Sequence, residues 1–366
     1  MTAEQRALRE AVAGLLEKRS PESRVRELMA TDTGHDETLW HDLAEMGLLG
    51  LAIPEAHGGT GAGHTELGII MEEMGRALLC APFLSTAVLA PALLAATGDD
   101  AEQARVLPRI AAGSAIVTLA HAESRSPLVP EHISTRARRC ADGWTLTGAK
   151  NYVLDGVAAD LIYVLAATDD GPAVFAVDRG ADGLTAATLT TVDATRKLTG
   201  LAFADTPARL VGEISSGRSA FTAALEAGGI ALTSEQAGGA QRAVRMAADY
   251  AGTRFQFARA IGSFQAVKHM CADMLTDAES AVSAARHVAA AYDAAAPDRA
   301  ADLALAQAFC ADAYVFVAAT NIQVHGGIGF TWEHPAHLYL RRARGSAQLF
   351  GSAAEHRERY LRSKGA

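Results

Sequence analysis

The hydrophobic pattern of this 366-residue chain changes its period twice, and this change most narrows the folds that the chain can adopt. Up to Ala112, apolar residues recur mainly at helical spacing. From Ile116 to Val211, alternating residues and short apolar runs are separated by Gly, Asp and Pro, which is typical of β-strands. After Gly212, helical spacing returns. The pattern predicts an α+β fold with an N-terminal α-helical domain (1–115), a middle antiparallel β domain (116–212) and a C-terminal four-helix bundle (213–366).

Local signals mark the ends of several predicted helices. Thr2 and Gln5 have the spacing of a capping box in front of an apolar helical pattern. Pro297 separates two helices of the last domain, because proline cannot continue a helix. In that domain we expect helices over residues 220–253, 267–296, 298–323 and 353–361.

Composition and charge exclude several classes of function. The net charge of −9 argues against a broad nucleic-acid surface. The longest apolar stretch, 84–96, is broken by Pro91 and is too short to span a bilayer, so we expect a cytoplasmic protein. The cysteines are far apart, which predicts reduced thiols rather than a disulfide framework or a zinc site: Cys80, Cys140, Cys271 and Cys310. The spacing of a histidine-rich group also matches no common metal site: His325, Glu333, His334 and His337.

The stretch from Arg254 to Met274 joins two of the predicted helices. It contains an arginine followed by aromatic and glycine residues, and helical spacing resumes at Val267. This order predicts a helix, a tight corner and a second helix, which by itself is also common in ordinary helical bundles.

Five sequence segments, in the same order along nearly the whole chain, resemble segments of the acyl-CoA dehydrogenase family. They are GLAIPEAHGG, EEMGRALL, LTGAKNYVLDGVAADLIYV, RFQFARAIGSFQAVKHMCADM and QVHGGIGFTWEHPAHLYLRRAR, and the last two are the most specific. The resemblance implies an oligomeric flavoprotein of lipid metabolism that binds FAD and acts on an acyl-CoA thioester.

The resemblance also implies which residues hold the cofactor. Arg254 would pair with the FAD pyrophosphate, to which a guanidinium offers a matching fork of donors. Phe257 and Gln265 would line the same cofactor. A second group would come from a partner chain and contact the other end of the dinucleotide: Gln323, His325, Gly326 and Gly327.

The implied reaction needs a carboxylate that removes the α proton of the thioester while the flavin accepts a hydride. The usual position of this glutamate falls on Phe350, and the position used by some members falls on Gly228. Neither residue accepts a proton. Glu235 lies two helical turns beyond Gly228 on the same helix face, about 10 Å along the axis.

The β domain departs from the family pattern at its flavin contacts as well. The segment His121–Leu128 replaces a turn that usually hydrogen-bonds the flavin, while Tyr152 and Leu154 replace the usual Trp and Thr. Tyr152 can still stack on a ring, but Leu154 offers no side-chain hydrogen bond.

Three hypotheses follow. In the first, the chain is one subunit of a heteromeric acyl-CoA dehydrogenase whose related partner supplies the base, similar to actinobacterial heterotetramers that act on steroid or other bulky acyl-CoAs. In the second, it is a self-sufficient flavoenzyme that uses Glu235 or altered chemistry. In the third, it is a structural family member without FAD.

Overall fold

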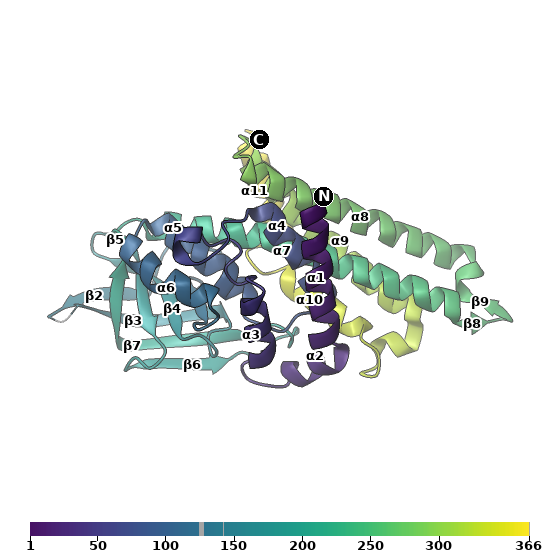
Figure 1. Cartoon of the computed structure of the whole chain (residues 1–366), viewed down its shortest axis with the longest axis horizontal. Coiled ribbons are helices and arrows are strands. Elements are labelled where there is room, and N and C mark those ends of the chain that lie inside the picture. The colour runs from purple at the N-terminus through teal and green to yellow at the C-terminus, as the bar shows by residue number, and fades with distance from the viewer. Residues whose placement is uncertain (124–127, 142, 366) are drawn as a thin grey trace. The chain divides into compact units, whose positions relative to one another are not determined.

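The structure is a computed structural model that describes residues 1–123, 128–141 and 143–365 (Figure 1). The described residues form two compact units. Unit 1 consists of residues 1–26 and 64–79 and of the chain from Gly229 onwards. Unit 2 consists of the described residues of 27–63 and 80–228. The N-terminal helices are therefore shared between the two units.

The core of unit 2 is a seven-stranded sheet. Its strands are β1 (Val117–Ala120), β2 (Arg136–Cys140), β3 (Gly143–Leu154), β4 (Leu161–Thr168), β5 (Gly171–Asp178), β6 (Leu184–Thr188) and β7 (Leu198–Val211). The order is β1-β4-β2-β3-β7-β5, and because β5 also pairs with β4, five strands close into a ring. Closure leaves these five strands without an open edge.

The β domain of the predicted fold is confirmed, although its pairing is not wholly antiparallel. β1 runs parallel to β4 over four residue pairs, and β2 meets β4 in parallel at Arg136 and Ala167. The remaining pairings in this sheet are antiparallel. Alternating hydrophobicity reports which face of a strand is buried, but it does not report the direction of the strand beside it.

Short helices complete unit 2: α3 (Glu37–Glu45), η1 (Glu55–His57), η2 (Leu84–Leu89), α5 (Ala90–Thr97) and α6 (Asp100–Ala111). Glu102 of α6 is buried and its carboxylate accepts a 2.7 Å hydrogen bond from the Tyr163 hydroxyl of β4. Burial alone would raise the pKa of Glu102, but hydrogen bonds from Arg105, Arg209 and Tyr163 lower it to about 2. This ionised carboxylate fixes α6 on the sheet.

The C-terminal part of the chain is helical, as predicted, and unit 1 combines most of it with N-terminal helices. The helices of unit 1 include α1 (Ala3–Arg19), α4 (His64–Arg76), α8 (Gln265–Asp293), α9 (Arg299–His325), η4 (Gly326–Phe330), α10 (Ala336–Ser346) and α11 (Ala353–Ser363). The helices α2 (Glu22–Met29) and α7 (Gly217–Thr253) contain residues of both units. The capping box at the start of α1 is confirmed, with Thr2 and Gln5 bonded reciprocally at 2.9 and 3.1 Å.

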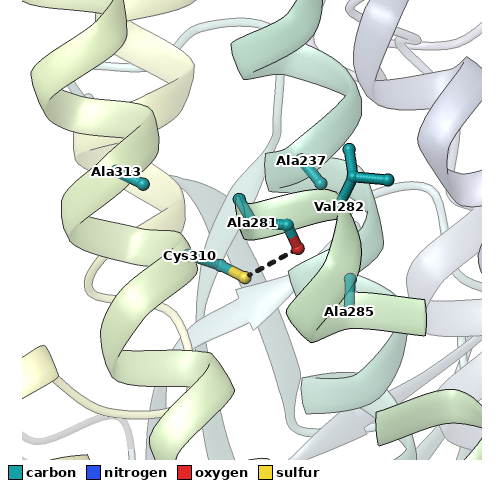
Figure 2. Packing of buried hydrophobic residues seen from close by; sticks show 6 residues of the cluster. All are labelled: Ala237, Ala281, Val282, Ala285, Cys310 and Ala313. Carbon is teal, nitrogen blue, oxygen red and sulfur yellow. Dashed lines mark hydrogen bonds between the residues drawn. The ribbon is translucent and has the colours of Figure 1, made fainter. Parts of the chain in front are cut away.

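Small side chains let the long helices of unit 1 approach closely. Figure 2 shows alanines of α7 and α8 packed against Cys310 and Ala313 of α9. The Cys310 thiol donates a weak hydrogen bond to the Ala281 carbonyl across this contact, at 3.6 Å. The packing explains the alanine content of these helices, since larger residues would separate the backbones.

Glycines permit an even closer contact between α4 and α7. A Cβ atom on Gly238 would lie 1.8 Å from the Glu72 carbonyl oxygen, and one on Gly75 would lie 2.0 Å from that of Glu235. The Glu72 carboxylate in turn accepts two hydrogen bonds from Arg286 of α8, at 2.9 and 3.0 Å, and pairs with Arg9 of α1. The glycines and this ion network hold four helices together.

One segment of the described chain, Arg299–Phe330, is long and apolar enough to cross a membrane by length and composition. In its most apolar window 61% of the residues are buried inside the protein, and core helices of soluble proteins pass the same test.

Candidate cofactor and catalytic sites

Arg254 follows the last residue of α7 and begins a small hairpin. The strands β8 (Phe255–Gln256) and β9 (Arg259–Ala260) pair through a two-residue turn, in which Phe257 and Ala258 have φ of 53° and 62°. The Arg254 side chain is exposed and its guanidinium has no hydrogen-bond or ion-pair partner among the described residues. A cation in this state is available to an anionic ligand.

Phe257 and Gln265, the two other residues predicted in this region, are also exposed. Phe257 is 87% exposed at the tip of the turn, where its ring lies 6.1 Å from that of Phe264. Gln265 is the first residue of α8, and its side chain lies 3.5 Å from that of His269. Such exposure of a large aromatic ring is typical of a surface that meets a ligand or another chain.

The second predicted group lies at the C-terminal end of α9. Gln323 is exposed, whereas His325 is buried and bonds to the Asn321 carbonyl at 2.8 Å. The His325 ring also stacks on Tyr250 of α7, with centroids 4.4 Å apart. Because Tyr250 lies one turn before Arg254, this stack brings both predicted groups to the same end of unit 1.

The local geometry at Gly326 and Gly327 fits a closely approaching ligand. Gly326 ends α9 with φ of 65°, a conformation that favours glycine. A Cβ atom on either residue would project into open space, with no protein atom within 4 Å. The exposed guanidinium of Arg254 fits a pyrophosphate, and this bare backbone fits the close approach of the other end of a dinucleotide. Their distribution between two chains around one FAD stays a prediction.

The histidines near the end of α9 stack on one another. The ring of His334 lies 4.3 Å from that of His325, and His337 packs on the exposed Trp332 at 4.6 Å. Burial lowers the pKa of all three imidazoles, and neighbouring cations lower those of His334 and His337 further. The described residues contain no group of side chains that could hold a metal ion.

The two positions where the resemblance places the base have no proton-accepting side chain. Phe350 is buried, at 4% exposure, in the turn between α10 and α11. Its φ of 71° is costly for a residue with a bulky side chain. Gly228 is a buried residue inside α7.

Glu235 lies in a different environment from that of a proton-transferring base. Its side chain is 4% exposed, and its carboxylate accepts a hydrogen bond at 3.1 Å from Arg342 of α10, which is itself 2% exposed. The same guanidinium donates a 3.1 Å hydrogen bond to the carbonyl of Leu79, which lies three residues after the end of α4. This pairing supports a structural role for Glu235, and its assignment as the base stays a prediction.

A buried lysine that no sequence pattern singles out links several segments of the β unit. Lys150 is fully buried and its ammonium donates to Glu123 at 2.6 Å and to the His121 carbonyl at 3.2 Å. Burial lowers the pKa of Lys150 to about 8. Glu123 also accepts backbone hydrogen bonds from Ser134 and Thr135, so one carboxylate ties three chain segments together.

The predicted departures in the β unit are only partly described. Tyr152 has φ of 55° at an irregularity of β3 and is 39% exposed, while Leu154 is 4% exposed. Within the segment His121–Leu128, residues 124–127 lie outside the described residues. Its role in flavin binding therefore stays a prediction.

A cleft of about 460 Å³ in unit 1 contains none of the predicted site residues. It is lined by residues of α1, α2, α4, α7 and α10, together with the residues next to them. Its volume falls within the range of small-molecule sites, but its charged residues are of both signs, so its chemistry favours no one ligand class.

Comparisons with known proteins agree with this architecture. The family model described as "Acyl-CoA dehydrogenase, N-terminal domain" matches residues 2–114, and that described as "Acyl-CoA dehydrogenase, C-terminal domain" matches residues 215–364. The chain is 37% identical over 354 residues to acyl-CoA dehydrogenase IpdE2 of Mycobacterium tuberculosis, covering 96% of this chain and 94% of the relative. It is 32% identical to FadE27 of the same organism, covering 90% and 88%.

Two similar structures are described by the names of two different chains. A chain from the ChsE4–ChsE5 complex of Mycobacterium tuberculosis matches with a TM-score of 0.90 and 30% identity, covering all of this chain and 98% of that one. A chain from a variant of the Tcur3481–Tcur3483 steroid ACAD matches with a TM-score of 0.87 and 30% identity, covering 99% and 98%.

Proposed function

The chain belongs to the acyl-CoA dehydrogenase family of flavoprotein oxidoreductases, and we propose that it is one subunit of a heteromeric, FAD-dependent member of that family. The enzyme would remove two hydrogens from the α and β carbons of an acyl-CoA thioester. A related partner chain would supply the carboxylate that takes the α proton.

The observation that carries this proposal is Phe350. A buried phenyl ring, 4% exposed, occupies the position to which the sequence resemblance assigns the catalytic carboxylate, and it accepts no proton. Gly228, at the other expected position, has no side chain to take over the role. Two of the residues proposed to contact the dinucleotide are retained, since Arg254 and Gln323 are exposed and polar, whereas the usual flavin contacts of the β unit are replaced by Tyr152 and Leu154.

The chain's own residues would then act by binding and positioning. Arg254 would pair with a phosphate of FAD, and the backbone at Gly326 and Gly327 would lie against the dinucleotide. Bound FAD supplies the electron-accepting chemistry of the reaction. The stacked rings of Tyr250 and His325 would hold these two contact points at a fixed separation.

The relatives support a heteromeric assembly and a bulky substrate. The two solved relatives named above are described as pairs of different chains, and one is described as a steroid enzyme. We infer that the partner of this chain is another family member and that the acyl group is large and alicyclic.

Purification with and without the partner tests the proposal. Alone, the chain should be colourless or should carry flavin that an acyl-CoA does not bleach. Co-expressed with a dehydrogenase-like chain encoded nearby, it should purify as a yellow complex that a bulky acyl-CoA bleaches. If the chain alone is yellow and is bleached by substrate, it is a self-sufficient enzyme and the subunit proposal is wrong.

A further inference from the structure

Polar side chains face glycines of α7 from the buried side of α9, and the cofactor and base assignments leave them unused. A Cβ atom on Gly229 would lie 2.4 Å from the Gln307 amide nitrogen, and one on Gly239 would lie 2.5 Å from the Tyr314 hydroxyl. Gln307 and Tyr314 are seven residues apart, so they share one helix face. This buried polar face contrasts with the apolar face that α9 shows in Figure 2.

A small cavity of about 10 Å³, measured as room for the centre of a water molecule, lies beside Gln307. Gln307 is 6% exposed and His356 of α11 is 4% exposed, and both line it. The other lining residues come from α7, α9 and the segment that precedes α11: Gly229, Leu232, Thr233, Gln236, Ala311, Ser346, Leu349 and Gly351. A cavity of this size holds about one water molecule.

Both polar side chains have a buried atom without a hydrogen-bond partner. These atoms are Gln307 Oε1 and His356 Nδ1. Burial and the nearby Arg359 together lower the pKa of His356 to about 4, against the opposing effects of Glu355 and the Gly351 backbone. The imidazole is therefore neutral near pH 7. In a neutral imidazole Nδ1 either accepts through its lone pair or donates its hydrogen, and in both cases it needs a partner when buried.

Gln307 Oε1 can only accept a hydrogen bond, and each of the two atoms costs stability while it stays unpaired in the interior. The occupant must therefore donate to Gln307 Oε1, bond to His356 Nδ1 as donor or acceptor, and fit the volume of one water molecule. A cation is disfavoured because the lining residues include no carboxylate.

We propose that this cavity binds one buried water molecule, which forms hydrogen bonds with Gln307 Oε1 and His356 Nδ1. The water joins α9 to α11. It also lies beside the turn between α10 and α11, because Gly351, the residue after Phe350, lines the same cavity.

A crystal structure of the protein at better than about 2 Å tests the proposal directly. We expect an isolated density peak at ~2.7–3.2 Å from both Gln307 Oε1 and His356 Nδ1. An empty cavity would overturn the proposal. So would a Gln307 amide rotated to donate directly to His356.

A double-mutant cycle gives a second readout in solution. Gln307→Met and His356→Leu each remove one hydrogen-bonding partner of the water and release it, so the second substitution should cost less than it does alone. We expect the double variant to miss additivity by about threefold or more in its unfolding equilibrium constant. The control pair Gln307→Met and Glu355→Gln should be additive, because Glu355 does not line the cavity. Additivity of both pairs would contradict the bridging water.

Discussion

Substituting Glu235 separates a structural carboxylate from a catalytic base. Its partner Arg342 is 2% exposed, and the two side chains meet at 3.1 Å. Removing one member of a buried ion pair costs about 3–5 kcal/mol, because the other charge stays buried. Glu235→Gln keeps an oxygen that accepts from Arg342, so we expect the lower end of that range, about 3 kcal/mol.

The assay combines urea unfolding with turnover of the assembled complex. Glu235→Gln should lower the unfolding midpoint, while the turnover of the complex that remains folded should change less than about threefold. The double variant Glu235→Leu, Arg342→Met removes both charges and should recover much of the stability, as such replacements do elsewhere. A fall in turnover of a hundredfold or more, with FAD retained and the midpoint unchanged, would refute this reasoning and identify Glu235 as the base.

Three further predictions follow from other contacts. Gly238→Ala should lower the free energy of unfolding in urea by about 1–3 kcal/mol, because the new methyl group would lie 1.8 Å from a carbonyl oxygen. Gly252→Ala on the same helix has open space around it and should be neutral or stabilising. Between pH 6.5 and 4 the unfolded chain binds a proton at His356 that the folded chain does not, so the free energy of unfolding should fall by up to about 3 kcal/mol as the pH falls through this window. The pH dependence should be flatter in His356→Leu, and an unchanged slope would argue against a buried neutral imidazole. Arg254→Met should weaken FAD binding by the co-expressed complex about 10- to 100-fold, because a charge-assisted hydrogen bond contributes about 1.5–3 kcal/mol. Flavin absorbance after dialysis measures the loss, and full retention of FAD would show that Arg254 does not belong to the cofactor site.

Much of the fold could be predicted because its signals are local. The capping box of Thr2 and Gln5 depends on residues three positions apart, and the predicted helix 298–323 lies within two residues of α9. The parallel pairing of β1 with β4 was missed because it joins residues 44 positions apart, such as Val117 and Leu161, without a local signal. Spacing alone also did not single out α10 as a helix.

The candidate site divides in the same way. Arg254 and Gly326 could be proposed from segments of sequence, and the structure adds that Tyr250 and His325 bring them to one end of the unit. The ion pair of Glu235 joins positions 107 residues apart, so no spacing rule predicts it. The only sequence signal of the buried pair between Lys150 and Glu123 is a lysine within an otherwise strand-like segment. No spacing rule identifies Glu123 as its partner.

The stoichiometry of reducible flavin tests the central claim most directly. The complex of this chain with its partner would be titrated anaerobically with a bulky acyl-CoA while flavin absorbance and the amount of each chain are measured. The account predicts one substrate-reducible flavin for each pair of unlike chains, and none for this chain alone. A reducible flavin on every chain, or on this chain without a partner, would contradict it.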